Sequence, residues 1–165
     1  MFGKLEKRID EINRALRSPG LLLVSGLEKP NIMAVHWATL GCLWGKPVFT
    51  TAIKKTRRTY DLLEKSGVFT INVPRKDIAD EIMRIDSVSG HEVDKFSEFN
   101  LHPVKAKNIG TYIVSDCGIH LECRIIYKSD MDGANLSDEI KKSVYDGGDN
   151  YHVLYFAEIL DIYET

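Results

Sequence analysis

The sequence of 165 residues is long enough for one domain with a sizeable hydrophobic core. Apolar residues make up 44% of the chain and charged residues 28%, as in ordinary globular proteins. The net charge of −2 argues against a nucleic-acid-binding protein, and no apolar run reaches the roughly 20 residues of a membrane span. We therefore expect one domain over residues 1–165 that binds neither nucleic acid nor membrane.

The first third of the chain predicts one helix and three strands. Apolar residues at helical spacing predict an amphipathic helix over residues 1–17, which ends at Ser18-Pro-Gly20. β-forming residues predict strands over residues 21–27, 32–43 and 48–53, with turns at residues 28–31 and 45–47.

The rest of the chain alternates helices, strands and polar loops. Thr56 or a neighbour is predicted to cap a helix over residues 57–65, which Gly67 ends. The elements expected after it are a strand over 68–73 stopped by Pro74, a helix over 76–85, a loop and short helix over 86–96, and strands over 119–128 and 152–163. The polar interval 130–150 predicts a surface excursion with a helix at 136–144.

Six or so strands, mostly close in sequence and with helices between them, favour a mainly β fold, an antiparallel barrel with helical additions. The strand–helix–strand unit over residues 48–73 leaves an α/β sheet as the alternative. That alternative is disfavoured by the long C-terminal strands and by the lack of a G-x-G-x-x-G turn.

The cysteines and the N-terminus predict a cytoplasmic protein without a metal. Cys42, Cys117 and Cys123 are odd in number and form no C-x-x-C pair, so we expect reduced thiols. The charged segment 1–8 lacks the apolar centre of a signal peptide. His120 and Cys123 would point to opposite faces of a strand, which disfavours a metal site there.

The strongest candidate binding segment is Lys54-Lys-Thr-Arg-Arg-Thr59, where a strand meets a helix. Free N–H groups at a helix start favour phosphate, and arginines bind it bidentately. Basic residues there oppose the helix dipole, so a favourable role requires an anion or an acidic partner. The alternative is a solvated basic helix start. With apolar strands beside it to hold a flat ring, the segment suggests a phosphorylated cofactor with an aromatic head.

The second polar loop and two residue types add weaker candidates. Gly90 permits close backbone approach and Lys95 adds a charge, although these residues alone favour a helix-capping loop with Ser87 and Asp94 as caps. Tryptophans at 37 and 44 can wall a flat ring or belong to a core or interface. His152 opens the last strand at a plausible site mouth, where a lone histidine is more often structural.

Six segments in order resemble the flavin reductase-like, FMN-binding split-barrel proteins, including flavoredoxin-type members. They are residues 31–39, 40–47, 53–60, 67–74, 87–96 and 151–159, and together they cover about residues 21–163.

The resemblance implies a homodimer with FMN held non-covalently near the subunit interface. It implies roles for nine cofactor-binding residues: phosphate contacts from Lys54, Arg57 and Thr59, assisted by Ser89, Gly90 and Lys95, and isoalloxazine contacts from the strand around Trp37, Ala38 and Thr39. His152 falls where many members place a histidine near the flavin or nicotinamide. Many relatives carry arginine in place of Lys54 and an aromatic residue in place of Arg58.

The implied activity is an FMN-dependent oxidoreductase. Hydride from NADH or NADPH would pass to flavin N5, and electrons would then pass to free flavin, ferric iron or a partner protein. A flavin-binding electron carrier without its own nicotinamide site is the first alternative. A non-catalytic binding domain that retains the barrel is the second.

Overall fold

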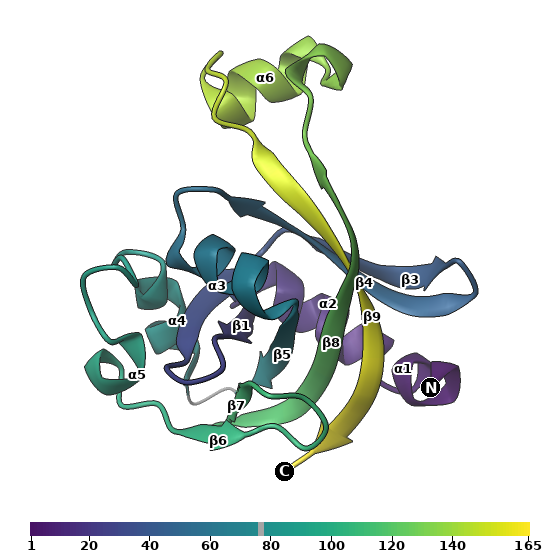
Figure 1. Ribbon diagram of the computed structural model, residues 1–165, viewed down its shortest axis with the longest axis vertical. Coiled ribbons are helices and arrows are strands. Elements are labelled where there is room, and N and C mark those ends of the chain that lie inside the picture. Colours follow the sequence, from purple (N-terminus) through teal and green to yellow (C-terminus); the bar gives the residue numbers. More distant parts are fainter. Residues whose placement is uncertain (76–77) are drawn as a thin grey trace.

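A curled antiparallel sheet of seven strands forms the body of the protein (Figure 1). The computed structural model describes residues 1–75 and 78–165. The strand order is β2-β1-β5-β8-β9-β4-β3, and β6 and β7 form a separate pair. The strands are β1 (Leu21–Ser25), β2 (Asn31–Val35), β3 (Ala38–Leu43), β4 (Lys46–Lys54), β5 (Val68–Pro74), β6 (Pro103–Lys105), β7 (Tyr112–Val114), β8 (Cys117–Asp130) and β9 (His152–Glu164).

Two helices precede the first strand, and the other helices lie in connections between strands. They are α1 (Phe2–Glu6), α2 (Ile9–Arg17), α3 (Arg58–Ser66), α4 (Ala79–Ile85), α5 (Lys95–Glu98), the 3-10 helix η2 (Gly133–Asn135) and α6 (Asp138–Tyr145). Within the described residues, no helix combines the length and the apolar character that a membrane crossing requires.

The two edge strands of the sheet are joined by only two residues, His36 and Trp37. Seven strands in a flat sheet would separate the edges by about 29 Å, at about 4.8 Å per strand. The link from Val35 to Ala38 can span at most about 11 Å. The sheet must therefore curl until β2 lies close to β4 and β3. We call this junction the seam.

Backbone hydrogen bonds hold the link in the seam. The carbonyl oxygen of Trp37 accepts from the backbone N–H of Ala52 at 3.4 Å and from Oγ1 of Thr51 at 3.1 Å. The prediction of one strand over residues 32–43 is therefore wrong. The apolar run is continuous in sequence, but its halves belong to opposite edges of the sheet.

Two apolar clusters lie on either side of β1 and β2, which explains why both strands are buried along their whole length. One cluster fills the barrel and includes Ile12 and Leu16 of α2. The other lies outside β1 and β2, where Ile82 and Ile85 of α4 and Phe96 of α5 cover the sheet. This second layer fixes the position of the loop that follows α4.

Most of the predicted elements are confirmed, including the antiparallel barrel. The α/β alternative is wrong, because β4 and β5 are separated in the sheet by β8 and β9. The helix expected over 1–17 is divided into α1 and α2, and β6 and β7 were not predicted. The helix expected over 76–85 is present from Ala79 to Ile85, and the start of that prediction lies outside the described residues.

The strands β8 and β9 extend beyond the barrel as an arm that ends in η2 and α6, at the top of Figure 1. This confirms the predicted excursion over residues 130–150, with its helix at Asp138–Tyr145. Tyr145 is buried although most of α6 is exposed. The buried Tyr145 connects α6 with the start of β9, where its hydroxyl lies 2.8 Å from Nδ1 of His152.

His120 is part of a buried polar network. Its Nδ1 lies 2.7 Å from Oδ1 of Asn72, and its Nε2 lies 2.9 Å from Oγ1 of Thr165. Burial lowers its pKa to about 4, so the ring is neutral at pH 7. Cys117 and Cys123 belong to different apolar clusters.

Candidate functional site

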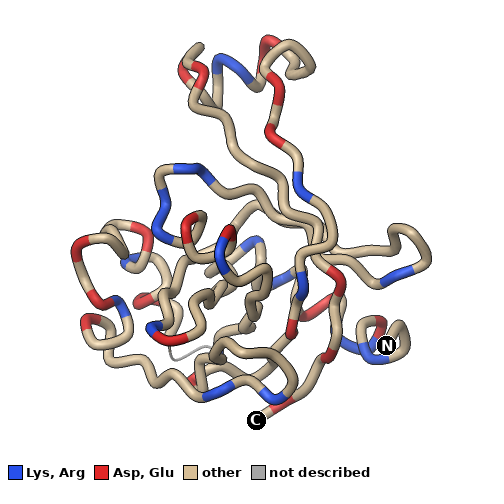
Figure 2. The backbone as a smooth tube through the Cα atoms, viewed as in Figure 1, with Lys and Arg blue, Asp and Glu red and all other residues tan. Residues whose placement is uncertain are grey.

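The basic segment forms the turn between β4 and α3, where Figure 2 shows lysine and arginine gathered along the tube. Helix α3 begins at Arg58, and its N-cap residue is Arg57, whose side chain makes no capping hydrogen bond. The predicted N-cap, Thr56 or a neighbour, is thus confirmed in its position at Arg57 but not as a side-chain cap, and Gly67 ends the helix with φ +66°, as expected. The first N–H groups of α3 have no side-chain cap, which favours an anion.

A cavity of about 160 Å³, which we call the basic cavity, opens beside this helix start. It is lined by Asn31, Met33, Thr56, Arg57, Arg58, Thr59, Ser89, Gly90 and Lys95. Lys95 is only 4% exposed, and its Nζ donates to the carbonyl of Ile85 at 2.8 Å. Burial lowers the pKa of Lys95, and the nearby Arg57 lowers it further, while Asp86 raises it.

Asn31 connects the two loops that form the basic cavity. Its Nδ2 donates to Oγ1 of the buried Thr59 at 3.1 Å, which leaves the Thr59 hydroxyl proton available to a ligand. A Cβ atom added to Gly90 would lie only 2.1 Å from Oδ1 of Asn31, so only glycine permits this packing. Asn31 therefore sets the distance between α3 and the 86–96 loop.

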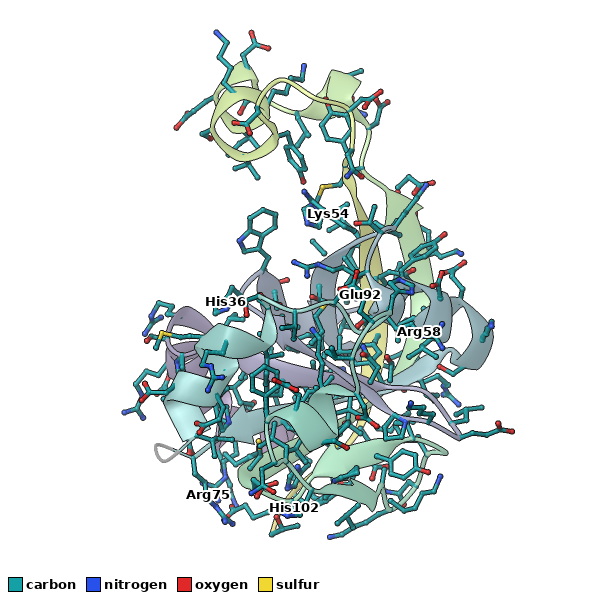
Figure 3. All side chains as sticks on the ribbon, turned by 90° about the vertical axis from the view of Figure 1, so that its left-hand side faces the viewer. His36, Lys54, Arg58, Arg75, Glu92 and His102 are labelled. Carbon is teal, nitrogen blue, oxygen red and sulfur yellow. The ribbon has the colours of Figure 1, made fainter. Side chains whose placement is uncertain are left out.

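A larger cavity of about 310 Å³ lies along the seam, and we call it the seam cavity. It is lined by Met33, Ala34, Val35, His36, Trp37, Ala52, Ile53, Lys54, Arg57, Asp86 and His152. Met33 and Arg57 line both cavities, so the seam and basic cavities adjoin. In Figure 3, Lys54 lies near the base of the arm, with His36, Arg58 and Glu92 below it.

The wall of the seam cavity is built from an open sheet edge and two rings. β2 pairs with β1 on one side, and within the described residues its other edge carries no strand. The ring of Trp37, which is 48% exposed, lies 4.8 Å from the ring of His152 at an interplanar angle of 52°. A flat ligand here would meet backbone N–H and carbonyl groups on one side and an aromatic surface beside them.

His152 is buried, and Nδ1 of its ring lies 2.8 Å from the hydroxyl of Tyr145. Burial lowers the pKa of His152 to about 4, and the charges of Lys54 and Arg57 contribute to the shift. The ring therefore stays neutral at pH 7. A neutral imidazole beside a cavity can offer one hydrogen-bond donor or acceptor, but no charge.

The charges of the two cavities are not balanced within the described residues. Lys54 and Arg57 are half-buried, and their side chains make no hydrogen bond or ion pair there. Lys55 in the same turn lies 2.8 Å from Asp130, and Arg58 lies 4.0 Å from Asp61. Of these two partnered side chains, Lys55 lines neither cavity, whereas Arg58 lines the basic cavity. Lys54 and Arg57 line the cavities without a partner among the described residues, and they favour an anion.

One carboxylate oxygen in the lining of the seam cavity is also without a partner among the described residues. Oδ1 of Asp86 is buried and accepts no hydrogen bond from the described residues, although Asp86 lines the seam cavity. A buried acceptor without a donor costs free energy, on the order of 1–3 kcal/mol. A ligand hydroxyl at this point would supply the missing donor.

The structure brings most of the predicted site residues together in the two adjoining cavities. Trp37, Lys54, Arg57 and His152 line the seam cavity, while Arg57, Thr59, Ser89, Gly90 and Lys95 line the basic cavity. Ala38 and Thr39 do not join them. They pair with Thr51 and Thr50 of β4. They line a separate cavity of about 210 Å³, which we call the outer cavity. Trp37 and Ala52 line both the outer cavity and the seam cavity.

Several cavity residues were not predicted from the sequence: Asn31, Met33, Ala34, Val35, His36, Ala52, Ile53 and Asp86. The apolar ones lie in strands whose pattern predicts only burial. Gly20, with φ +113°, lies so close to His36 that a Cβ there would be 2.6 Å from Cε1 of the ring. A glycine at such a φ is a local signal of a close approach, but its partner is not apparent from the sequence.

Comparison with known proteins gives a family match over most of the chain. Residues 15–165 match the family described as "Flavin reductase like domain". An uncharacterized protein of Archaeoglobus fulgidus is 29% identical over 105 residues, which are 64% of this chain and 59% of that protein. The uncharacterized protein YddH of Escherichia coli is 28% identical over 100 residues, which are 60% of this chain and 52% of that protein, so the chain spans less than two thirds of the length of either relative.

Solved structures share the fold. The flavoredoxin of Desulfovibrio vulgaris (Miyazaki F) has a TM-score of 0.70 at 23% identity, covering 90% of this chain and 70% of that one. An FMN-binding protein from Thermus thermophilus with bound 1-cyclohex-2-enone has a TM-score of 0.69 at 19% identity, covering 89% and 70%. The Streptomyces globisporus C-1027 NADH:FAD oxidoreductase SgcE6 has a TM-score of 0.67 at 16% identity, covering 88% and 75%.

The low pKa of His152 makes stability depend on pH in a defined window. Because the pKa is about 4 in the folded protein and about 6.5 for an unperturbed histidine, the unfolded chain binds a proton there that the folded chain does not. The stabilisation is complete above about pH 6.5 and is lost as the pH falls through 4. As the pH falls from about 6.5 to about 4, the free energy of unfolding should fall more steeply in wild type than in His152→Gln. The difference between the two slopes should be up to about 1.4 kcal/mol per pH unit.

Urea denaturation at a series of pH values measures both slopes. Above about pH 7 the two curves should run parallel, which serves as the internal control. Parallel curves at lower pH as well, down to the folded-state pKa of about 4, would mean that His152 titrates alike in the folded and unfolded chains.

Proposed function

Since the chain belongs to the flavin reductase-like family, we propose that it binds FMN across the seam and basic cavities and transfers reducing equivalents from NADH or NADPH to a second acceptor. The observation that carries this proposal is a pair of cations without a partner among the described residues, Lys54 and Arg57, between a flat-walled cavity and an uncapped helix start. A phosphate at one end and a flat ring at the other match that arrangement.

The residues of the basic cavity fit a phosphate group. Arg57 has a guanidinium without a partner among the described residues, Thr59 has a hydroxyl proton to donate, and α3 presents its first N–H groups. Lys95 adds a positive charge that is held in place by Ile85. The sequence alone left a solvated helix start as the alternative. The burial of Thr59 and Lys95 favours a ligand site instead.

The orphaned oxygen of Asp86 fits the middle of the same ligand. The ribityl chain of FMN carries hydroxyl groups between the ring and the phosphate. Asp86 lines the seam cavity, and Arg57 lies at the boundary with the basic cavity. A ribityl hydroxyl that donates to Oδ1 of Asp86 would satisfy the buried acceptor and fix the ligand between its two ends.

The protein's part in the proposed reaction is to bind, orient and shield. Bound FMN would supply the hydride chemistry at its ring. The open edge of β2 would orient the ring through backbone groups, and Trp37 with His152 would limit access of water beside it. Lys54 would add positive charge near the ring, which favours an electron-rich ligand.

Anaerobic addition of NADH or NADPH to the FMN-loaded protein should bleach the visible absorbance of the flavin. The cofactor released by heat should be FMN and not FAD, because the basic cavity is compact and the sequence contains no dinucleotide motif. FAD in the released fraction, or no flavin after reconstitution, would contradict the cofactor assignment. A bound flavin that neither nucleotide bleaches would indicate an electron carrier without a nicotinamide site.

Arg57→Ala should weaken FMN binding by about 1.5–3 kcal/mol, the range for hydrogen bonds to charged groups. The variant should remain folded, since Arg57 makes no hydrogen bond through its side chain within the described residues. A fluorescence titration with FMN measures the affinity. Arg17→Ala, at the exposed end of α2, is the matched control and should bind like wild type. Equal affinities for both variants would return Arg57 to the role of a surface residue.

We also propose that two copies of the chain form a homodimer through the outer face of β4, β8 and β9. Trp44 and Tyr127 are 60% and 48% exposed on this face. Their rings contact each other and Phe156, with centroids 5.4 to 6.4 Å apart. A clustered aromatic surface of this kind favours association. The outer cavity adjoins the seam cavity at Trp37, and its lining includes Leu154 of β9. The partner would therefore lie beside the proposed site.

Light scattering at micromolar concentration should give the mass of a dimer for wild type. Tyr127→Arg places a charge in the aromatic cluster and should shift the mass toward the monomer. Val104→Arg on β6 is the matched control, because Val104 is also 48% exposed but lies outside that cluster. A wild-type monomer that still binds FMN would rule out the dimer proposal.

A further inference from the structure

Within the part of the chain that the structure describes, a hydrogen bond of Tyr145 connects the arm with the lining of the seam cavity. Tyr145, the last residue of α6, places its hydroxyl 2.8 Å from Nδ1 of His152 and 3.3 Å from Sδ of Met131. The Tyr145 ring packs against Tyr151 with centroids 4.9 Å apart, which holds it in this position. A residue from outside the barrel thus contacts a histidine that lines the cavity.

The proton between Tyr145 and His152 can be assigned from the chemistry of the three groups. The hydroxyl has one proton, and burial raises the pKa of Tyr145, so that proton is retained at pH 7. A neutral imidazole nitrogen is a stronger acceptor than a thioether sulfur. The separation of 2.8 Å is also typical of a full hydrogen bond. The hydroxyl therefore donates to Nδ1, and the ring proton of His152 resides on Nε2.

The other side of the ring is available to a ligand. Within the described residues Nε2 of His152 makes no hydrogen bond, whereas Nδ1 is occupied by Tyr145. The two nitrogens lie on different sides of the imidazole, and His152 lines the seam cavity. Nε2–H is therefore a donor without a protein partner in the described part of the chain.

We propose that Tyr145 is a positioning residue, which fixes His152 as the Nε2–H tautomer and thereby gives the seam cavity a neutral hydrogen-bond donor for a carbonyl oxygen or ring nitrogen of a planar heteroaromatic ligand. The tautomer follows from the contacts of the chain alone, while its consequence for FMN rests on the proposed function. Without the tyrosine hydroxyl, either nitrogen can carry the proton, and the donor is no longer defined.

The surrounding charges keep this donor neutral. The groups that face His152 are Tyr145 from α6, Lys54 from β4, and Arg57 and Asp86, which line the same cavity. The two cations disfavour an imidazolium beside them. A neutral donor adds directional recognition where the cations already supply charge.

NMR of the protein labelled with ¹⁵N-histidine tests the tautomer without any cofactor. Two-bond ¹H–¹⁵N spectra distinguish Nε2–H from Nδ1–H, and His152→Gln identifies the signals of this ring. Wild type at pH 7 should show Nε2–H. Tyr145→Phe keeps the ring and loses only the hydroxyl, so the signals should shift toward a mixture of tautomers. Met131→Leu removes the competing sulfur and should leave the wild-type pattern unchanged.

Either of two results would overturn the assignment: Nδ1–H in wild type, or the wild-type pattern retained in folded Tyr145→Phe. If Tyr145→Phe does not fold, the wild-type spectrum and the Met131→Leu spectrum still decide between the two tautomers. A thermal melt of each variant shows whether that variant is folded.

An FMN titration of the same variants tests the role toward the ligand. Loss of one defined neutral hydrogen bond should weaken binding by Tyr145→Phe about two- to tenfold, with Met131→Leu close to wild type. If Tyr145→Phe changes the tautomer but binds FMN as tightly as wild type does, the donor role of His152 toward FMN is overturned. No binding of FMN by wild type would overturn the proposed function and leave the tautomer result standing.

Discussion

The two-residue link between β2 and β3 is the constraint on which the rest of the structure depends. It joins opposite edges of a seven-stranded sheet, so the sheet has to curl and the edges have to meet. Where they meet, the edge of β2 has no strand beside it within the described residues, and the end of β4 delivers Lys54 to the same place. The geometry that closes the barrel thus also leaves an open backbone edge next to a cation.

The second consequence of the curl is electrostatic. The turn after β4 lies against the loop after α4, which brings Arg57 near Lys95 without an acidic partner for Arg57 in the described residues. Oδ1 of Asp86 is left without a donor close by. Like charges and an orphaned acceptor lower the stability of the chain itself. An anionic ligand that carries hydroxyl groups reverses both effects, so binding and stability should be coupled at this site.

The sequence predicts the elements of this fold better than their connections. Strands β4, β5, β8 and β9 follow from their β-forming residues and from the turns that bound them. The break at His36–Trp37 could not be predicted, because residues 31–40 contain no glycine or proline and fit one long strand as well as two short ones. The basic segment 54–59 was apparent because six consecutive residues carry its chemistry. Asn31 and Asp86 were not, because their roles depend on loops that meet only after folding.

The two ends of the proposed site differ in how they recognise a ligand. The basic cavity uses charge: Arg57 and Lys95 favour an anion in any orientation that brings it near. The other end uses direction, through the edge of β2 and the single donor of His152, whose low pKa keeps it uncharged at pH 7. If His152 were also cationic, its protonated ring would attract any anion. The two ends of the site would then no longer differ in how they recognise a ligand. The burial that lowers the pKa of His152 therefore preserves the polarity of the site, and the contact with Tyr145 extends that control to α6, outside the barrel.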